Sequence, residues 1–171
     1  MEKPILKATM VNQFREELPF QEEPFWGIET DGYGPFRGLH MHNGFEVGFV
    51  FAGEGTINLN GTEHTLKTND VFFFDASVPH WHMNVSENRL KMFIIMFPAM
   101  MLHTLSFPVT DIRLLKPFLA VRNGFSPVLE QRHDLGNRIH DVVCLYQQRP
   151  EQWDLKSLPH IIYLLVEIAC A

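Results

Sequence analysis

Three histidines and one glutamate near the middle of the chain have the residue types and the spacing of a metal centre. His40 and His42 are separated by one residue, and Glu46 follows four residues later. His80 lies in a second block of the sequence. Neutral imidazoles and a carboxylate together suit a divalent ion such as Zn, Ni, Fe or Mn. The candidate ligands of such an ion are therefore His40, His42, Glu46 and His80.

Alternate residues of a strand share a face, so one strand can send several side chains into the interior of a β fold. If His40 points inward, Phe36 does too. An inward Glu46 takes Gly48 and Val50 with it. Gly48 has no side chain, and we expect it to leave room beside the polar cluster. The predicted ligand-binding patch in the interior comprises His40, His42, Glu46, His80, His82, Phe36 and Val50.

Burying this many polar groups without partners costs free energy, and three arrangements avoid that cost. A metal ion can accept the imidazoles and the carboxylate. A polar small molecule with ordered waters can satisfy the same groups without an ion. The histidines can also bond to one another and to Glu46 in a purely structural cluster. We predict no catalytic residue, because the sequence contains no nucleophile elbow, phosphate-binding glycine loop or paired catalytic carboxylates.

Short β-type runs separated by turn residues predict a mainly β fold for the first two thirds of the chain. Asn60-Gly61 is a strong hairpin signal, because both central positions of a type I′ turn need a positive φ. Asn69 is expected in a left-handed turn for a similar reason. The number and spacing of the runs indicate a sandwich or small barrel. These runs are residues 25–30, 36–42, 45–52, 55–60, 63–66, 70–74, 80–84 and 90–97.

Helical patterns replace the strand patterns after Pro98. Residues 111–119 predict a short helix, and residues 135–148 carry apolar side chains at helical spacing. Asp154 is expected to cap a second long helix. The apolar stripes of the last two helices are wide enough to cover the core and leave surface for a partner helix. We therefore predict a homodimer that forms through these helices.

The polar residues 1–24 predict an N-terminal arm with at most one short strand. Its acidic pairs, Glu16-Glu17 and Glu22-Glu23, indicate a solvated face. The whole chain of 171 residues suits one domain with a sizeable core. Its net charge of −6, without a cluster of Lys and Arg, argues against DNA binding by this chain alone. The sequence shows no signal peptide and no membrane-spanning run, so we expect a cytoplasmic protein without a membrane partner.

The two histidine blocks resemble the two motifs of the cupin family. The first is Gly-x-His-x-His-x-x-x-Glu followed after six residues by Gly53, and the second ends with His80 and Asn84. The second block departs from the family pattern at turn positions, where Asn69 and Ser77 stand in place of glycines. The resemblance implies a cupin-type double-stranded β-helix, a jelly-roll barrel, followed here by a C-terminal helical pair.

Residues 40–97 also resemble the N-terminal sensor domain of AraC-type transcription regulators. The likeness rests on His-x-His-x-x-x-Glu-Val-Gly-Phe-Val, on Gly-x-Gly, on Asn-Asp-Val-Phe-Phe-Phe…Pro-His, and on a barrel followed by two helices. In that family the barrel binds a small effector, often a sugar, a helix pair makes the dimer, and a separate C-terminal domain binds DNA. That domain would follow Ala171 and is absent from this chain.

The resemblance implies a non-enzymatic module that senses a small polar effector, dimerises and regulates DNA binding through the absent domain. It divides the chain into an arm (1–24), a cupin barrel sensor domain (25–110) and a helical dimerisation segment (111–171). The alternative is a small metal-dependent cupin enzyme, an isomerase or dioxygenase, that uses the same four residues as metal ligands.

Overall fold

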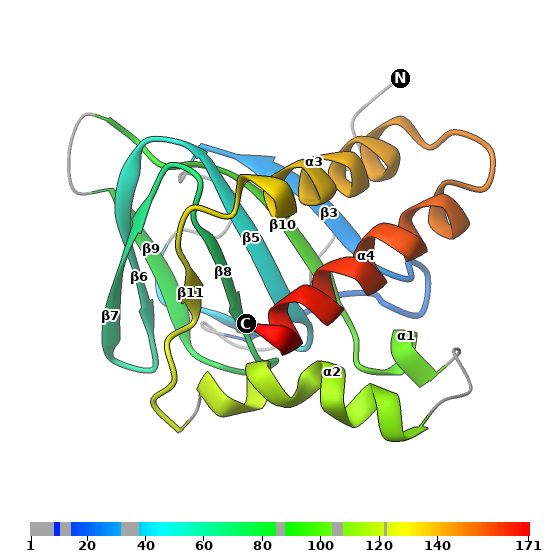
Figure 1. Ribbon diagram of the computed structural model, residues 1–171, viewed down its shortest axis with the longest axis horizontal. Coiled ribbons are helices and arrows are strands. Elements are labelled where there is room, and N and C mark those ends of the chain that lie inside the picture. The colour runs from blue at the N-terminus through cyan, green and yellow to red at the C-terminus, as the bar shows by residue number, and fades with distance from the viewer. Residues whose placement is uncertain (1–8, 11–14, 32–37, 85–87, 104–107, 122) are drawn as a thin grey trace.

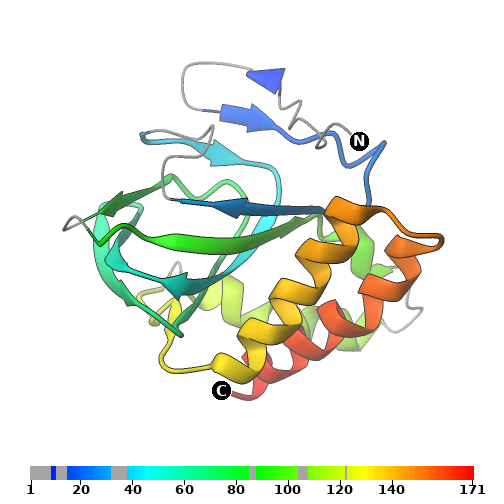
Figure 2. The ribbon, with the colours of Figure 1, turned by 90° about the horizontal axis from the view of Figure 1, so that it is seen from above.

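The computed structural model describes residues 9–10, 15–31, 38–84, 88–103, 108–121 and 123–171 (Figure 1). Two β layers face each other, with helices outside one of them (Figures 1 and 2). The larger layer is an antiparallel sheet in the order β11 (Val128–Leu129), β8 (Val71–Phe74), β5 (Phe45–Ala52), β10 (Lys91–Phe97) and β3 (Trp26–Thr30).

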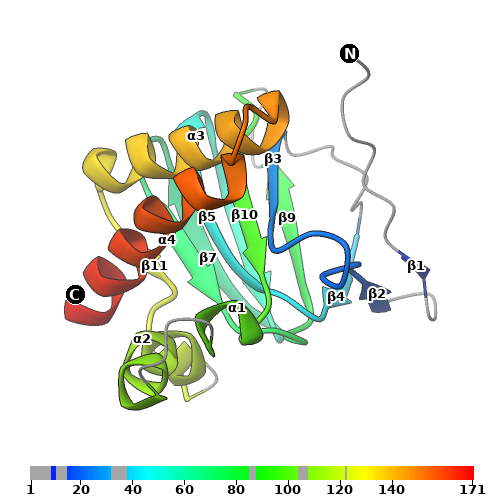
Figure 3. The ribbon, with the colours of Figure 1, turned by 90° about the vertical axis from the view of Figure 1, so that its right-hand side faces the viewer.

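The facing layer is built from two three-stranded sheets. One has the order β7 (Thr62–Lys67), β6 (Glu54–Leu59) and β9 (His80–Asn84), and the other β1 (Thr9–Met10), β2 (Arg15–Glu17) and β4 (Met41–His42). An isolated antiparallel bridge between His40 and His80 joins the two sheets. Through this bridge the layer extends from β7 to the N-terminal strands β1 and β2, which lie on the right-hand side of Figure 3.

Alternation along β5 divides its side chains between the interior and the helices. Phe45 and Phe49 point outward, since Phe45 packs edge-on against Phe118 and Phe49 lies against Gly136. Glu46, on the opposite face, points between the two layers. A fully buried apolar core thus forms on both sides of the sheet, which explains why β5 and β8 are apolar along most of their length.

Four helices follow the strands: α1 (Met100–His103), α2 (Pro108–Val121), α3 (His133–Gln148) and α4 (Trp153–Cys170). Helix α3 lies across the outer face of β3, β10 and β5, and α4 packs on α3 and α2 (Figures 1 and 3). Close packing of α3 depends on glycines, because a Cβ at Gly27 would lie 3.0 Å from the Cβ of Tyr146. None of the helices within the described residues is long and apolar enough to cross a membrane.

Turn residues behave as the sequence predicts. Asn60 and Gly61 both have positive φ, at 49° and 89°, as a type I′ turn between β6 and β7 requires. Asn69 and Ser77 also adopt positive φ, at 75° and 61°. These two residues therefore take the left-handed conformation that glycine adopts readily in the family pattern, and the departures from that pattern leave the turns intact.

The prediction of a mainly β fold followed by helices is confirmed, with local differences. The helix predicted over 111–119 begins at Pro108 and ends at Val121. Asp154 does not cap α4, because that helix begins one residue earlier and its N-cap, Gln152, makes no side-chain capping bond. The arm contains two short strands where at most one was expected, and β2 pairs in parallel with β4.

Candidate metal centre

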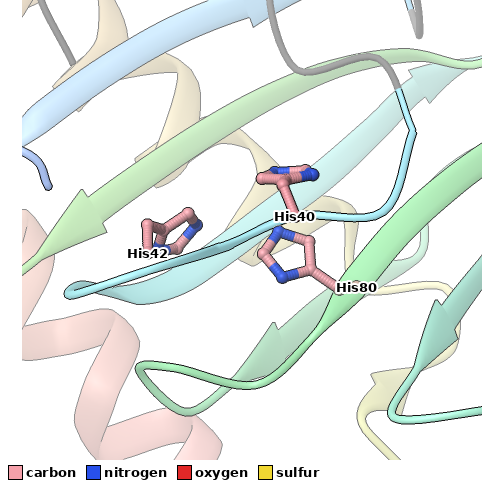
Figure 4. Close-up of side chains that lie close together, drawn as sticks. All are labelled: His40, His42 and His80. Atoms are coloured by element: carbon pink, nitrogen blue, oxygen red, sulfur yellow. The ribbon is translucent and has the colours of Figure 1, made fainter. Parts of the chain in front are cut away.

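The two histidine blocks meet inside the barrel because one backbone bridge holds them opposite each other. The amide of His40 donates to the carbonyl of His80 at 3.0 Å, and the amide of His80 donates to the carbonyl of His40 at 2.8 Å. Their ring centroids lie 4.1 Å apart. His42 follows at the end of β4, with its ring centroid 5.0 Å from that of His80. Figure 4 shows the three side chains lying close together.

Backbone carbonyls fix the orientation of all three rings. The Nδ1 atoms of His40, His42 and His80 lie 3.0, 3.0 and 2.8 Å from the carbonyls of Gly38, Gly44 and Val78. Since a carbonyl only accepts, each Nδ1 carries the proton and each Nε2 of a neutral ring keeps its lone pair. Hydrogen bonds of this kind orient the histidines of metal sites. One nitrogen from each ring lies within 4.8 Å of the others.

Burial keeps the rings of His40 and His80 in the neutral form that a metal requires. The His80 side chain is 1% exposed, and desolvation, with smaller contributions from the charges of His40 and His42, holds its pKa well below the ordinary value. Desolvation also lowers the pKa of His40, although its bond to Gly38 and the charge of Glu46 partly oppose the shift. The rings of His40 and His80 are therefore uncharged at neutral pH, the form in which an imidazole binds a metal.

Glu46 reaches the same point from β5, in the opposite layer. Its Oε2 lies 2.9 Å from His42 Nε2 and 3.8 Å from His80 Nε2. With the His42 proton on Nδ1, a lone-pair nitrogen faces a carboxylate oxygen, and the contact is favourable when a metal ion or a further proton lies between them. Glu46 Oε1 and His80 Nε2 are buried without a hydrogen-bond partner among the described residues.

A divalent metal ion such as Zn, Ni, Fe or Mn fits this donor set. Three imidazoles converge, and a carboxylate adjoins two of them, so an ion would satisfy the orphaned atoms together. The three histidines form the group whose ligand atoms are mutually close, while Glu46 lies against His42 and His80 at its side. The predicted divalent ion is thus supported by the geometry.

The other predicted patch residues are distributed differently. His82 faces the same interior, with its ring centroid 6.3 Å from that of His80, and burial lowers its pKa to about 4. Its Nε2 is buried without a partner, but His82 lies outside the group of close ligand atoms. Val50 is fully buried in the core. Phe36 lies outside the described residues.

The expected space beside Gly48 is filled. A Cβ at this glycine would lie 2.0 Å from a ring atom of Phe72, its cross-strand partner on β8. The expectation of free room was therefore wrong. Gly48 instead allows the Phe72 ring to cross the inner face of the sheet beside the polar cluster.

Sequence reasoning missed Glu16. The acidic pair Glu16-Glu17 was expected on a solvated face, but Glu16 is only 5% exposed, and burial raises the pKa of its carboxyl, partly opposed by the charge of His42. The alternation along β2 explains the difference, because Glu17 points away and pairs with Arg15 at 2.9 Å. The alternation in residues 15–18 could have indicated that Glu16 is buried. It does so only once the arm is known to form a strand.

Comparison with known proteins identifies the domain. Residues 27–96 match the family model described as a Cupin domain. Over 59 residues the chain is 36% identical to an oxalate-binding protein from Thermotoga maritima, covering 34% of this chain and 49% of the relative. The chain therefore spans about half the length of this curated relative.

Two solved structures give similar matches. A predicted oxalate decarboxylase from Thermotoga maritima is 28% identical, with a TM-score of 0.37 over 43% of this chain and 64% of that one. An oxalate decarboxylase variant from Bacillus subtilis is 16% identical, with a TM-score of 0.34 over 36% of this chain and 18% of that one.

These matches correct one prediction. The expectation that the chain is not an enzyme is contradicted by its similarity to a cupin relative described as an oxalate-binding protein. None of these matches is described as an AraC-type regulator. Together with the two facing β layers and the helices that follow them, the family match shows that the chain contains a cupin domain, a jelly-roll barrel followed by C-terminal helices.

Proposed function

We propose that this chain is a metal-dependent cupin enzyme that binds a small, oxygen-rich carboxylic acid at a divalent metal ion. The observation that carries the proposal is the convergence of three oriented imidazoles on a point that a buried carboxylate also reaches. The curated relative, described as oxalate-binding and 36% identical over 59 residues, supports oxalate as the first ligand to test.

The residues of the barrel site would have different roles. His40, His42, His80 and Glu46 would hold the ion, which when bound supplies Lewis-acid polarisation of a coordinated oxygen. Three imidazoles and one carboxylate leave positions open for an acid that chelates through two oxygens. His82 adds a buried, neutral ring whose Nε2 has no partner among the described residues. It can exchange a hydrogen bond with the bound acid inside the barrel.

Binding of oxalate to the metal-loaded and the metal-free chain tests this function. Isothermal titration calorimetry should detect oxalate only after loading with Zn²⁺ or Mn²⁺, because the ion supplies the positive charge in the site. Loss of ¹³C-oxalate, followed by NMR with the Mn²⁺-loaded chain, then measures turnover. Equal oxalate affinity with and without the ion would contradict the metal-dependent site.

A second candidate, the sensor domain of an AraC-type regulator with a small polar effector such as a sugar, draws support from the helices. Leu155, Pro159, Ile162 and Val166 follow one another on α4 at intervals of four, three and four residues, the spacing of a helix–helix seam. Leu155 and Val166 are 61% and 41% exposed. This row suits a second copy of the chain. Tight sugar binding without any turnover of carboxylic acids would favour the sensor over the enzyme.

A further inference from the structure

A second buried carboxyl group, that of Glu16 on the N-terminal strands, lies beside His42 of the metal centre. β2 runs parallel to β4, and Glu16 is the register partner of His42. Register partners on neighbouring strands project their side chains to the same face, with their Cβ atoms about 5 Å apart. The His42 side chain lies in the interior beside Glu46, so Glu16 enters the same space.

The Glu16 side chain takes no part in the hydrogen bonds found among the described residues. Its Oε2 is buried without a partner, and none of the ion pairs found among the described residues includes it. Buried polar atoms without partners are rare in folded proteins and call for an explanation such as a ligand or an ion. A metal ion held by the histidines and Glu46 would satisfy His80 Nε2 and Glu46 Oε1, but it would leave Glu16 without a donor.

Charge and hydrogen-bonding capacity decide what Glu16 can recognise. An ionised carboxylate accepts hydrogen bonds and donates none. Fully ionised oxalate also offers only acceptors and adds two negative charges, so it would be repelled by Glu16. An α-hydroxy acid has one carboxylate to chelate the ion and a hydroxyl proton to donate, and it carries a single charge.

We propose that Glu16 is a specificity-determining residue whose carboxylate accepts a hydrogen bond from the hydroxyl of a metal-bound α-hydroxy acid. The inference rests on the proposed function and narrows its substrate class. This centre would then prefer an acid such as glycolate over oxalate. The glycolate hydroxyl donates a hydrogen bond to Glu16, whereas fully ionised oxalate has no proton to donate.

The test compares glycolate and oxalate as probes of the full chain loaded with Zn²⁺, a redox-inert ion, at pH 8. Calorimetry should show tighter binding of glycolate than of oxalate by the unmodified protein. In Glu16→Gln, glycolate affinity should fall and oxalate affinity should rise, each by about tenfold, because a charge-assisted hydrogen bond and a like-charge repulsion are both removed. Glu17→Gln, on the other face of the same strand, is the matched control and should leave both affinities unchanged.

Glu16→Asp, which keeps the charge, should retain the preference for glycolate. Equal changes in both affinities in Glu16→Gln would overturn the inference, because a structural role would affect both acids alike. If Glu16→Gln does not fold, tighter binding of oxalate than of glycolate by the unmodified protein overturns it, as does a failure to bind either acid. Elemental analysis of the same samples separates these outcomes, since failure of the proposed metal centre itself would appear as a chain without zinc.

Discussion

At the scale of single residues, the centre is organised by short contacts with the backbone. His40, His42 and His80 each donate Nδ1–H to a carbonyl two residues away in the sequence. For His40 and His80 the accepting carbonyl precedes the histidine in the sequence. For His42 the accepting carbonyl follows it, in the turn before β5. Each ring therefore presents Nε2 to the interior as a consequence of local chain geometry, and long side-chain networks are not needed to orient it.

The buried imidazoles also make stability depend on pH. Burial lowers the pKa of His40 and His80, and that of His82 to about 4. Below about 6.5 the unfolded chain takes up protons at these rings, whereas the folded chain does not. The stabilisation is thus complete above about pH 6.5 and is lost as the pH falls toward 4.

We predict that the urea midpoint of the metal-free protein, prepared with a chelator, falls steadily between pH 7 and pH 4.5. Unfolding monitored by circular dichroism measures it. His82→Gln removes one titrating ring, so the urea midpoint of this variant should fall less steeply over the same pH interval. A midpoint that stays constant across this range would contradict the assignment of these rings as buried and neutral.

At the scale of elements, the site depends on how helix α3 supports the larger sheet. Glu46 is held in place from behind by the outward residues of β5, among them Phe49, whose ring covers Gly136 of α3. A Cβ at Gly136 would lie 2.3 Å from a ring atom of Phe49. Helix and sheet can therefore approach closely only while this position lacks a side chain.

Gly136→Ala should destabilise the protein by about 1–3 kcal/mol, because overpacking at the helix–sheet contact outweighs the gain of about 1 kcal/mol in helix propensity. Asn137→Ala, at the next and exposed position of α3, is the matched control and should change stability by no more than about 0.5 kcal/mol. Urea unfolding at pH 7.5 measures both variants. A Gly136→Ala protein as stable as the control would show that α3 does not pack closely on β5.

At the scale of the whole molecule, local patterns predicted more than long-range pairing. The Asn60-Gly61 turn and the histidine blocks were readable because their signals lie within a few residues. The filling of the space at Gly48 was not, since Phe72 approaches from another strand. The two-residue strand β11 carries no periodicity and exists only because it pairs with β8. Glu16 escaped notice for the same reason, because its burial depends on pairing with a strand that begins 25 residues later.

The exposed row on α4 leads to a prediction about assembly. If Leu155, Ile162 and Val166 pair with a second copy, Val166→Lys should lower the dimer fraction by placing charges along the seam. Lys156→Ala, an exposed change one residue away from the row, should leave it unchanged. Light scattering coupled to size-exclusion chromatography measures both. A strict monomer for the unmodified chain at high concentration would remove support for the sensor and its dimer.

The most direct test of the account is the metal content of the purified chain. After exposure to Zn²⁺ or Mn²⁺ and desalting, elemental analysis should find about one ion per chain, as expected for a single four-ligand centre. His80→Ala removes a converging nitrogen and should lower that content at least tenfold, whereas His64→Ala, a half-buried histidine of β7 outside the cluster, should not. A chain that retains no ion, or a His80→Ala variant that retains as much as the unmodified protein, would contradict the metal centre.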